Sequence, residues 1–582
     1  MHHHRRIRVV LAGLNRRVCL LILVSAGCHA PGAADQAVDR APLFDGMGNH
    51  HRAIATANPT AQRYFDQGLI WAFGFNHDEA IRSFHEVARL DPNCAMAWWG
   101  VALCNGPHIN NPVMTERQTE AAWSALQKAL ALREHATPVE RAMIDALAKR
   151  YGDPAAMQAA VAREAKDPAS PDMEAMITAR RPYDEAYASA MREMRATYPD
   201  DADIAVLFAE SLMDLQPWDL WTKDGQPKGN TEEVLAALEE AMQLAPDHPG
   251  ALHLYIHAVE ASRQPQRAMV AADRLRNLVA ASGHLTHMPS HIDVRTGRWR
   301  EASDQNAAAI EADRRYRELS PRQNLYRAYM AHNHHFLSYA SMMEGRREAA
   351  LRAAREMIAG VPEEWGRQNA ALMDGYMAIE LEVLMRFGLW DDILRARPPA
   401  EHFVIARALW RFTRGVAHAA KNEVDAAHRE QTAFRAAVQR VPQDALMAIN
   451  PADRVLKIAD LVLDGEIAYR EGRIDDAVAS LRNAATMEDD LQYMEPPEWI
   501  QPVRHTLGAI LLDSGRVEEA EAVYREDLAR WPENGWSLYG LSRCLKSRGA
   551  TAEADEIARR FNEAWSRADT RIGASCLCVK GA

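Results

Sequence analysis

The sequence lacks an excess of positive charge, and this excludes one class of partner. Its formal net charge at pH 7 is −12, from 68 Lys and Arg residues against 80 Asp and Glu residues. No large basic block offsets this balance, so a general affinity for nucleic acid or for an anionic membrane surface is not expected. We therefore predict no nucleic-acid partner.

Several familiar catalytic motifs are also missing. The chain contains no Gly-rich phosphate loop, no nucleophile elbow and no HExxH zinc motif. A strand-rich segment is absent as well, which favours an all-α protein. Motifs alone therefore leave open whether the protein is an enzyme.

Long hydrophobic runs are scarce. The apolar run at residues 18–24 is too short to span a bilayer, which needs about 20 residues. Arginines precede this run and small residues follow it, which predicts an export signal over residues 1–28. Residues 29–59, rich in Ala, Gly, Asp and Pro, are predicted to form a flexible tether.

The end of the predicted signal resembles a bacterial lipobox. Ser25-Ala26-Gly27-Cys28 ends in a cysteine, although Ser25 stands where a leucine is usual. The resemblance implies that Cys28 is lipidated and anchors the protein in a membrane. We expect a cell-envelope protein, an outer-membrane lipoprotein facing the periplasm; a secreted or periplasmic protein is the alternative.

Cysteines after Cys28 are few and odd in number: Cys94, Cys104, Cys544, Cys576 and Cys578. A bridge between Cys94 and Cys104 is possible but nothing requires it. The pair Cys576 and Cys578 is either a hook for a soft metal or part of a frayed tail, and we favour the tail.

Histidine pairs mark an internal repeat. His253 and His257 are four residues apart, as are His287 and His291, and the two pairs are offset by 34 residues (287 − 253 and 291 − 257). This offset is the period of the tetratricopeptide (TPR) helix-turn-helix repeat. Pro289, inside the second pair, predicts a helix kink, and Met288 is expected in the core.

Two stretches resemble the TPR pattern closely. Small residues there let antiparallel helices approach, aromatic residues fill the seam, and a proline ends the second helix. The first stretch has Tyr64, Gly68, Trp71, Ala80, Phe84 and Pro92 at the expected places, and the last has Gly508, Ala520, Tyr524 and Pro532. The chain also resembles long bacterial TPR proteins that combine an F-x-F-N-H-x-E-A opening (residues 73–80) with an H-M-P-S-H block (residues 287–291).

The resemblance implies a TPR-type α-solenoid of antiparallel helix pairs. We expect an N-terminal TPR array with a histidine-rich groove at residues 60–362. Degenerate helical repeats should follow at 363–456, then C-terminal TPR repeats at 457–568 and a tail at 569–582.

In TPR proteins, particular places on the first helix of each repeat line the concave inner groove. By that resemblance, one groove would hold His253, His257, His287, His291 and His334 as metal ligands, with His284 and Glu260 as possible additional ligands. Such a nitrogen-rich set suits a transition metal such as Zn or Cu rather than Ca or Mg.

Two function classes follow. The leading one is a cell-envelope scaffold that binds a peptide or protein partner in its groove, whether the histidines there hold a metal or only form hydrogen bonds. The second is a transition-metal-dependent enzyme, an oxidoreductase or hydrolase. A secondary polar site, Asn76, His77 and His108, lies near the N-terminal end of the array, and His77 is expected several helices away from the histidine groove.

Overall fold

The computed structural model describes residues 40–166, 173–320 and 323–579, and their regular secondary structure is almost entirely helical. The strands are one short antiparallel hairpin, β1 (Leu446–Met447) and β2 (Asn450–Pro451). The predicted all-α class is confirmed. Within the described ranges, we find no helix with the length and apolar character that a membrane span requires.

The N-terminal part of the solenoid runs to the helix that carries the first histidine pair. Its elements are α1 (Pro59–Phe73), α2 (His77–Leu90), α3 (Ala95–Asn105), α4 (Glu116–Ala131), the 3-10 helix η1 (Arg133–His135), α5 (Pro138–Leu147), α6 (Pro154–Glu164), α7 (Met173–Thr197), α8 (Ala202–Met213), α9 (Thr231–Leu244) and α10 (Pro249–Glu260).

The first helix pair shows why the repeat pattern folds as it does. Asn58 caps α1 and Asn76 caps α2, each through a side-chain oxygen that accepts from backbone amides. A Cβ at Gly68 would lie 2.6 Å from the ring of Phe84. Only glycine lets α1 approach α2 this closely, and the buried Phe84 fills the seam.

The central part contains the second histidine pair on a broken helix. Pro289 has no amide hydrogen to donate, and one helix ends at His287 while the next begins at Pro289. Met288 at the break is fully buried. The elements are η2 (Pro265–Ala268), α11 (Met269–Leu275), α12 (Gly283–His287), α13 (Pro289–Thr296), α14 (Trp299–Leu319), α15 (Tyr326–Met343) and α16 (Arg347–Ala359).

The C-terminal part begins with short, irregular helices and returns to regular pairs. Its elements are α17 (Glu363–Gln368), α18 (Ala370–Met373), η3 (Gly375–Ala378), α19 (Ile379–Arg386), α20 (Trp390–Arg395), α21 (Val404–Ala420), α22 (Val424–Val438), α23 (Ala452–Arg470), α24 (Ile474–Asp489), α25 (Val503–Asp513), α26 (Val517–Arg530), α27 (Gly535–Ser547) and α28 (Thr551–Ala564).

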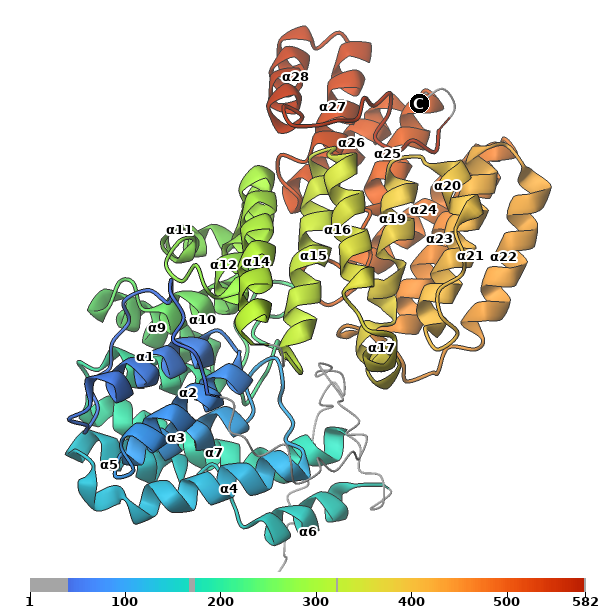
Figure 1. Ribbon diagram of the computed structural model, residues 1–582. Coiled ribbons are helices and arrows are strands. Elements are labelled where there is room, and N and C mark those ends of the chain that lie inside the picture. Colours follow the sequence, from blue (N-terminus) through green and yellow to red (C-terminus); the bar gives the residue numbers. More distant parts are fainter. Residues whose placement is uncertain (1–39, 167–172, 321–322, 580–582) are drawn as a thin grey trace, which may run out of the picture.

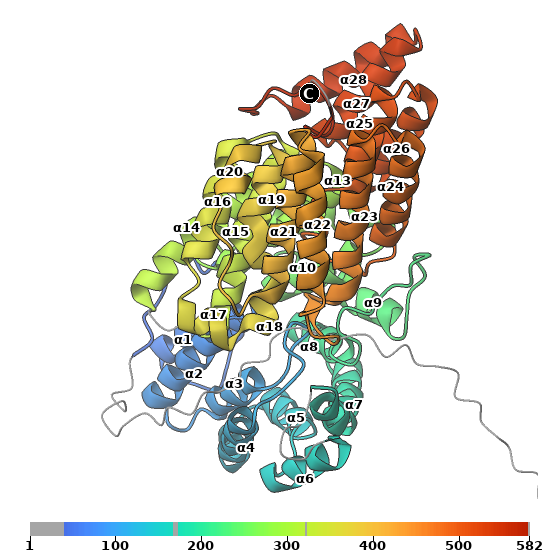
Figure 2. The same cartoon turned by 90° about the vertical axis from the view of Figure 1, so that its right-hand side faces the viewer.

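The solenoid curls back on itself. The indole of Trp299 at the start of α14 donates to the carbonyl of Pro532 at 2.8 Å, and the indole of Trp536 in α27 donates to the carbonyl of Met342 at 2.8 Å. Figure 1 shows α14–α16 between the first helices in blue and the last in red, and Figure 2 shows α21–α24 standing side by side. The loop before α25 is thereby brought against the central helices.

The predicted C-terminal tail is wrong for the residues up to Val579. Cys576 and Cys578 are disulfide-bonded to each other and buried against the C-terminal core. The hydroxyl of Ser575 donates to the carbonyl of His505, and Arg386 donates to the carbonyl of Ser575. Because these backbone groups have partners in the core, the segment packs rather than frays. Cys94 and Cys104 are free thiols at opposite ends of α3.

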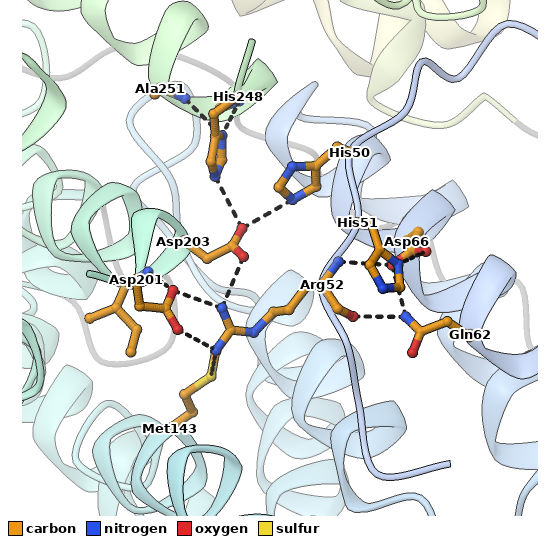
Figure 3. Close-up of polar contacts among 12 residues, drawn as sticks. His50, His51, Arg52, Gln62, Asp66, Met143, Asp201, Asp203, His248 and Ala251 are labelled. Carbon is orange, nitrogen blue, oxygen red and sulfur yellow. Dashed lines mark hydrogen bonds and ion pairs between the residues drawn. The ribbon is translucent and has the colours of Figure 1, made fainter. Parts of the chain in front are cut away.

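The predicted tether is also wrong from residue 40 onward. We call residues 40–58 the N-terminal strap, and Figure 3 shows how it is held. Arg52 pairs with Asp201 and Asp203, each at 2.9 Å, and His50 lies 3.1 Å from Asp203. Buried ionic partners fix this segment although its composition is typical of a linker. Residues 29–39, the predicted signal and Cys28 lie outside the described residues.

Candidate functional site

The interior of the solenoid contains a buried histidine centre built from four helices and one loop. His253, His257 and Glu260 come from α10, and His284, His287 and His291 come from α12 and α13. His332 comes from α15, and Glu495 from the loop before α25. His253 and His287 are 0% exposed. The predicted open groove is therefore a closed interior at this point.

The first histidine set consists of His253, His257 and His284. One ligand atom from each lies within 4.8 Å of the others, and Nε2 of His253 is 3.1 Å from Nε2 of His284. Nδ1 of His253 donates to the carbonyl of Phe73 at 2.6 Å, which leaves Nε2 as a free lone pair. Two nitrogens bound to one tetrahedral zinc ion lie about 3.3 Å apart, close to this spacing.

The second histidine set consists of His287, His291 and His332, again within 4.8 Å. Nδ1 of His287 lies 2.8 Å from Oδ1 of Asn306, and the amide of Asn306 donates to the carbonyl of Ala302, which fixes Oδ1 as the acceptor. His287 therefore carries its proton on Nδ1.

A conflict of lone pairs follows between His287 and His291. Nδ1 of His291 donates to Glu260 at 2.5 Å, so in the neutral ring its Nε2 is also unprotonated. The two Nε2 atoms nevertheless lie 2.7 Å apart. Two lone pairs at this distance repel unless a cation lies between the rings or beside both.

Glu260 joins the two sets. Its two carboxylate oxygens accept from Nδ1 of His257 at 2.8 Å and from Nδ1 of His291 at 2.5 Å. Burial would raise the pKa of Glu260, but His291 and His257 together lower it to about 2. The carboxylate is therefore ionised. Because it holds Nδ1 of both rings, one Nε2 atom of a neutral ring is directed toward each histidine set.

Burial, and after it a neighbouring imidazole, lowers the pKa of His253, His284 and His287 well below its usual value. The neutral form of these three rings is therefore favoured. Neutral imidazole nitrogens are the form that binds transition metals.

Two bulky residues beside the centre have strained backbones. Phe75 has φ 56° and Trp218 has φ 59°, values that favour glycine. The ring of Phe75 lies 4.6 Å from that of His253, and the ring of Trp218 lies 5.1 Å from that of His257. Such conformations cost about 1–3 kcal/mol each and concentrate at functional sites.

A hollow of about 80 Å³ opens beside the two sets, and we call it the central hollow. His257, His284, His291 and His332 contribute to its wall, together with Glu260 and Glu495. The other walls are mainly apolar: Trp218, Ala328, Tyr329, Ala331, Met357, Leu372, Met373, Tyr376 and Met494, with Asn110 and His335. The histidine centre thus faces a space that a small molecule could enter.

His334 does not belong to the centre, and His332 takes its place. Nδ1 of His334 is 3.7 Å from the carboxylate of Glu356 on α16. Successive residues turn by about 100° around a helix, so a shift of two positions turns a side chain to nearly the opposite face. The repeat place that we assigned to His334 is therefore wrong by two residues.

Glu495 was missed as a site residue. Its carboxylate lies 3.4 Å from Nδ1 of His291 although the two residues are far apart in sequence. Burial, and then the charge of Glu260, raises its pKa well above the usual value. The only local sign was its place in a stiff segment between Met494 and Pro496, and no spacing rule links that segment to α13.

The secondary polar site lies next to the centre rather than several helices away. The rings of His77 and His108 are 4.5 Å apart, and Phe75 stacks on His108 at 4.6 Å. The other side of Phe75 faces His253. Asn76, which caps α2, lines a separate hollow with His77 and His108. One aromatic ring therefore separates this polar hollow from the first histidine set.

A further cluster, His50, Asp203 and His248, is structural (Figure 3). Nδ1 of His248 accepts from the amides of Gly250 and Ala251, so its proton is on Nε2 and points at Asp203, 3.0 Å away. Both ring nitrogens of His248 are occupied, and Arg52 takes the other oxygen of Asp203. A metal ion would have to displace these partners.

A scan against protein-family models and a search of curated proteins found no match. Among solved structures, the human IFIT1 dimer with m7Gppp-AAAA is 14% identical, over 88% of this chain and 91% of that chain, with a TM-score of 0.33. The APC/C hetero-tetramer Cut9–Hcn1 is 12% identical over 83% and 76%, with a TM-score of 0.29, and the yeast Tom70 is 10% identical over 87% and 93%, with a TM-score of 0.27.

The helix pairs of the chain itself define a TPR-type α-solenoid of antiparallel pairs, and these low scores add nothing about function. Fold and site together describe a helical-repeat protein with a buried histidine centre.

Proposed function

We propose that this protein is a transition-metal enzyme whose two histidine sets each bind one ion of zinc or copper. The donors are imidazole nitrogens, with buried carboxylates beside them. Nitrogen donors of this kind select zinc, copper or a similar metal rather than calcium or magnesium. Each set offers three ligands and leaves a coordination position for another molecule.

The lone-pair conflict between His287 and His291 carries the proposal. Asn306 and Glu260 hold both rings with Nδ1 protonated, and the two free Nε2 atoms lie 2.7 Å apart. Without a bound cation this arrangement would be repulsive. We propose a metal ion as that cation, because His332 converges on the same point as the two rings and so offers a third nitrogen.

An ion in such a site supplies Lewis-acid or electron-transfer chemistry to a molecule bound next to it. The protein would orient the ligands through Glu260, Asn306 and the carbonyl of Phe73. Second-shell partners of this kind typically contribute 10–100-fold to metal affinity. Glu495, beside His291, is placed to exchange a hydrogen bond or a proton with a bound molecule.

The direct test is metal analysis of the mature chain, beginning near residue 29 and purified without a tag so that the leader histidines cannot contribute. We expect about two zinc or copper ions per chain. The double variant His287→Ala/His291→Ala should retain one ion, as should His253→Ala/His284→Ala. His334→Ala is the matched control and should retain both. Folded wild-type protein that takes up no transition metal at micromolar concentration would overturn the proposal.

Two further proposals come from the sequence and do not depend on the metal centre. The lipobox resemblance supports attachment of the chain to the cell envelope through Cys28. The solenoid supports binding of a peptide or protein partner, since stacked helix pairs present extended concave surfaces. Neither requires the buried histidines to be accessible to that partner.

A further inference from the structure

We call four of the histidines that line the central hollow (His257, His284, His291 and His332) its histidine floor, and the other lining residues its walls. The two parts differ in chemical character. Three aromatic side chains (Trp218, Tyr329 and Tyr376) and three thioethers (Met357, Met373 and Met494) line it. Aromatic rings and methionine sulfurs make favourable contacts with a bound aromatic ring. The walls therefore match an aromatic body better than a sugar, a peptide or a nucleotide.

The charges of the lining residues further restrict the class of ligand that the hollow can bind. Among the described residues, the charged side chains that line the hollow are Glu260 and Glu495, and no lysine or arginine does. Both oxygens of Glu260 accept hydrogen bonds, from Nδ1 of His257 and from Nδ1 of His291, as an ionised carboxylate does. An anion would meet this negative charge with no cationic side chain on the wall to offset it, so before any metal binds the hollow favours an uncharged molecule.

Some buried polar atoms without a hydrogen-bond partner lie where the walls of the hollow meet its histidine floor. Nε1 of Trp218 and, before a metal binds, Nε2 of His257 are buried without a hydrogen-bond partner among the described residues. Buried polar atoms are seldom left unpaired in native proteins. Atoms of this kind beside an apolar slot suit a ligand with one polar group at the end of an apolar body.

We infer that the central hollow binds an uncharged aromatic molecule that carries a single oxygen or nitrogen donor, with the ring among Trp218, Tyr329 and Tyr376 and the donor directed at the histidine floor. The inference deepens the proposed function. The direction of the donor rests on the metal centre, whereas the binding of the aromatic body rests on the walls alone.

The test compares three probes that share a methyl-substituted benzene ring: 4-methylphenol, which has ring and donor; toluene, which lacks the donor; and 4-methylbenzoate, which is anionic. Binding is measured by titration calorimetry or ligand-observed NMR on metal-free and metal-loaded full-length mature chain. On the metal-free protein, toluene and 4-methylphenol should bind with similar affinity and 4-methylbenzoate about tenfold more weakly. Metal loading should raise the binding affinity for 4-methylphenol relative to that for toluene by about tenfold or more.

Two variants tie binding to the hollow. Ala328 is half-buried and lines the hollow. In the variant Ala328→Trp the larger side chain should fill the hollow, and binding of toluene should be lost. Ala359→Trp, at the exposed end of α16, is the matched control and should bind normally. Met373→Lys places a cation in the wall, and the preference should reverse toward 4-methylbenzoate. A reversal of preference cannot result from misfolding alone.

The outcomes separate the two proposals. If toluene does not bind the metal-free wild type, or if Ala328→Trp leaves its binding unchanged, the aromatic pocket is wrong whatever the metal content. If toluene binds and Ala328→Trp blocks it, but metal never binds, the pocket stands; the proposed metal function and the direction assigned to the donor are then both overturned.

Discussion

Glu260 accepts a hydrogen bond from Nδ1 of His257 at 2.8 Å, and His257 lies one turn earlier on the same helix. Its second oxygen accepts from His291, so one carboxylate sets the tautomer of a ring in each histidine set. Glu260 is a positioning residue, because it acts through the ligands rather than in their place.

Glu260→Gln should lower the affinity of both sets for zinc or copper by about 10–100-fold. A glutamine side chain has one acceptor oxygen, so it can satisfy only one of the two Nδ1–H donors and presents its NH₂ group to the other. Competition with a chelator of known affinity measures the change. Glu466→Gln, at another buried glutamate outside the centre, is the control and should leave metal affinity unaltered.

His332→Ala should remove one metal ion per chain, while His334→Ala should not. The two residues are neighbours on α15, yet only His332 lies with His287 and His291; His334 faces Glu356. Metal content per chain, measured on both variants, decides between them. Equal loss from the two variants would place the second site elsewhere.

The N-terminal strap should make folding sensitive to acid. Burial would raise the pKa of Asp203, but hydrogen bonds from His248 and His50 hold it well below the usual value. A lowered folded-state pKa gives stability that is present above the unfolded value of about 3.9 and is lost as pH falls below it toward the folded value. The free energy of unfolding should therefore drop in that window.

Asp203→Asn should weaken this pH dependence and destabilise the protein at neutral pH by about 3 kcal/mol, because Arg52 would lose one of its buried partners. Urea unfolding at pH 7 and below pH 4 measures both effects. The control is Asp224→Asn at an exposed loop position, for which we expect little change at pH 7. Identical unfolding curves for Asp203→Asn and wild type would show that the strap is not held by this cluster.

Cys28→Ala should abolish lipidation and release the protein from the membrane fraction. A lipid anchor holds a chain at a membrane without a spanning helix. Incorporation of labelled palmitate and fractionation of cells measure the result, with Cys544→Ala as the control. A wild-type chain that never takes up label would remove the lipoprotein prediction.

Local rules were enough for much of the architecture. Gly68 and Phe84 sit at repeat places whose sizes are dictated by the contact between two adjacent helices, and the same logic predicts Gly508 beside Tyr524. The spacing of four between His253 and His257 likewise places both side chains on one side of α10. The pairing of these two histidines on one side of the helix therefore follows from short-range geometry.

Tertiary structure decided the rest of the site. His332 rather than His334 meets His287 and His291, and Glu495 reaches His291 because the late repeats curl back onto the central helices. Composition alone also suggested a free strap, whereas Arg52 finds buried carboxylates on a distant part of the chain. Helix pairing depends on neighbours in sequence, so the sequence determined it directly. The closure of the solenoid sums small rotations over many repeats, and only the folded chain determines which distant residues meet.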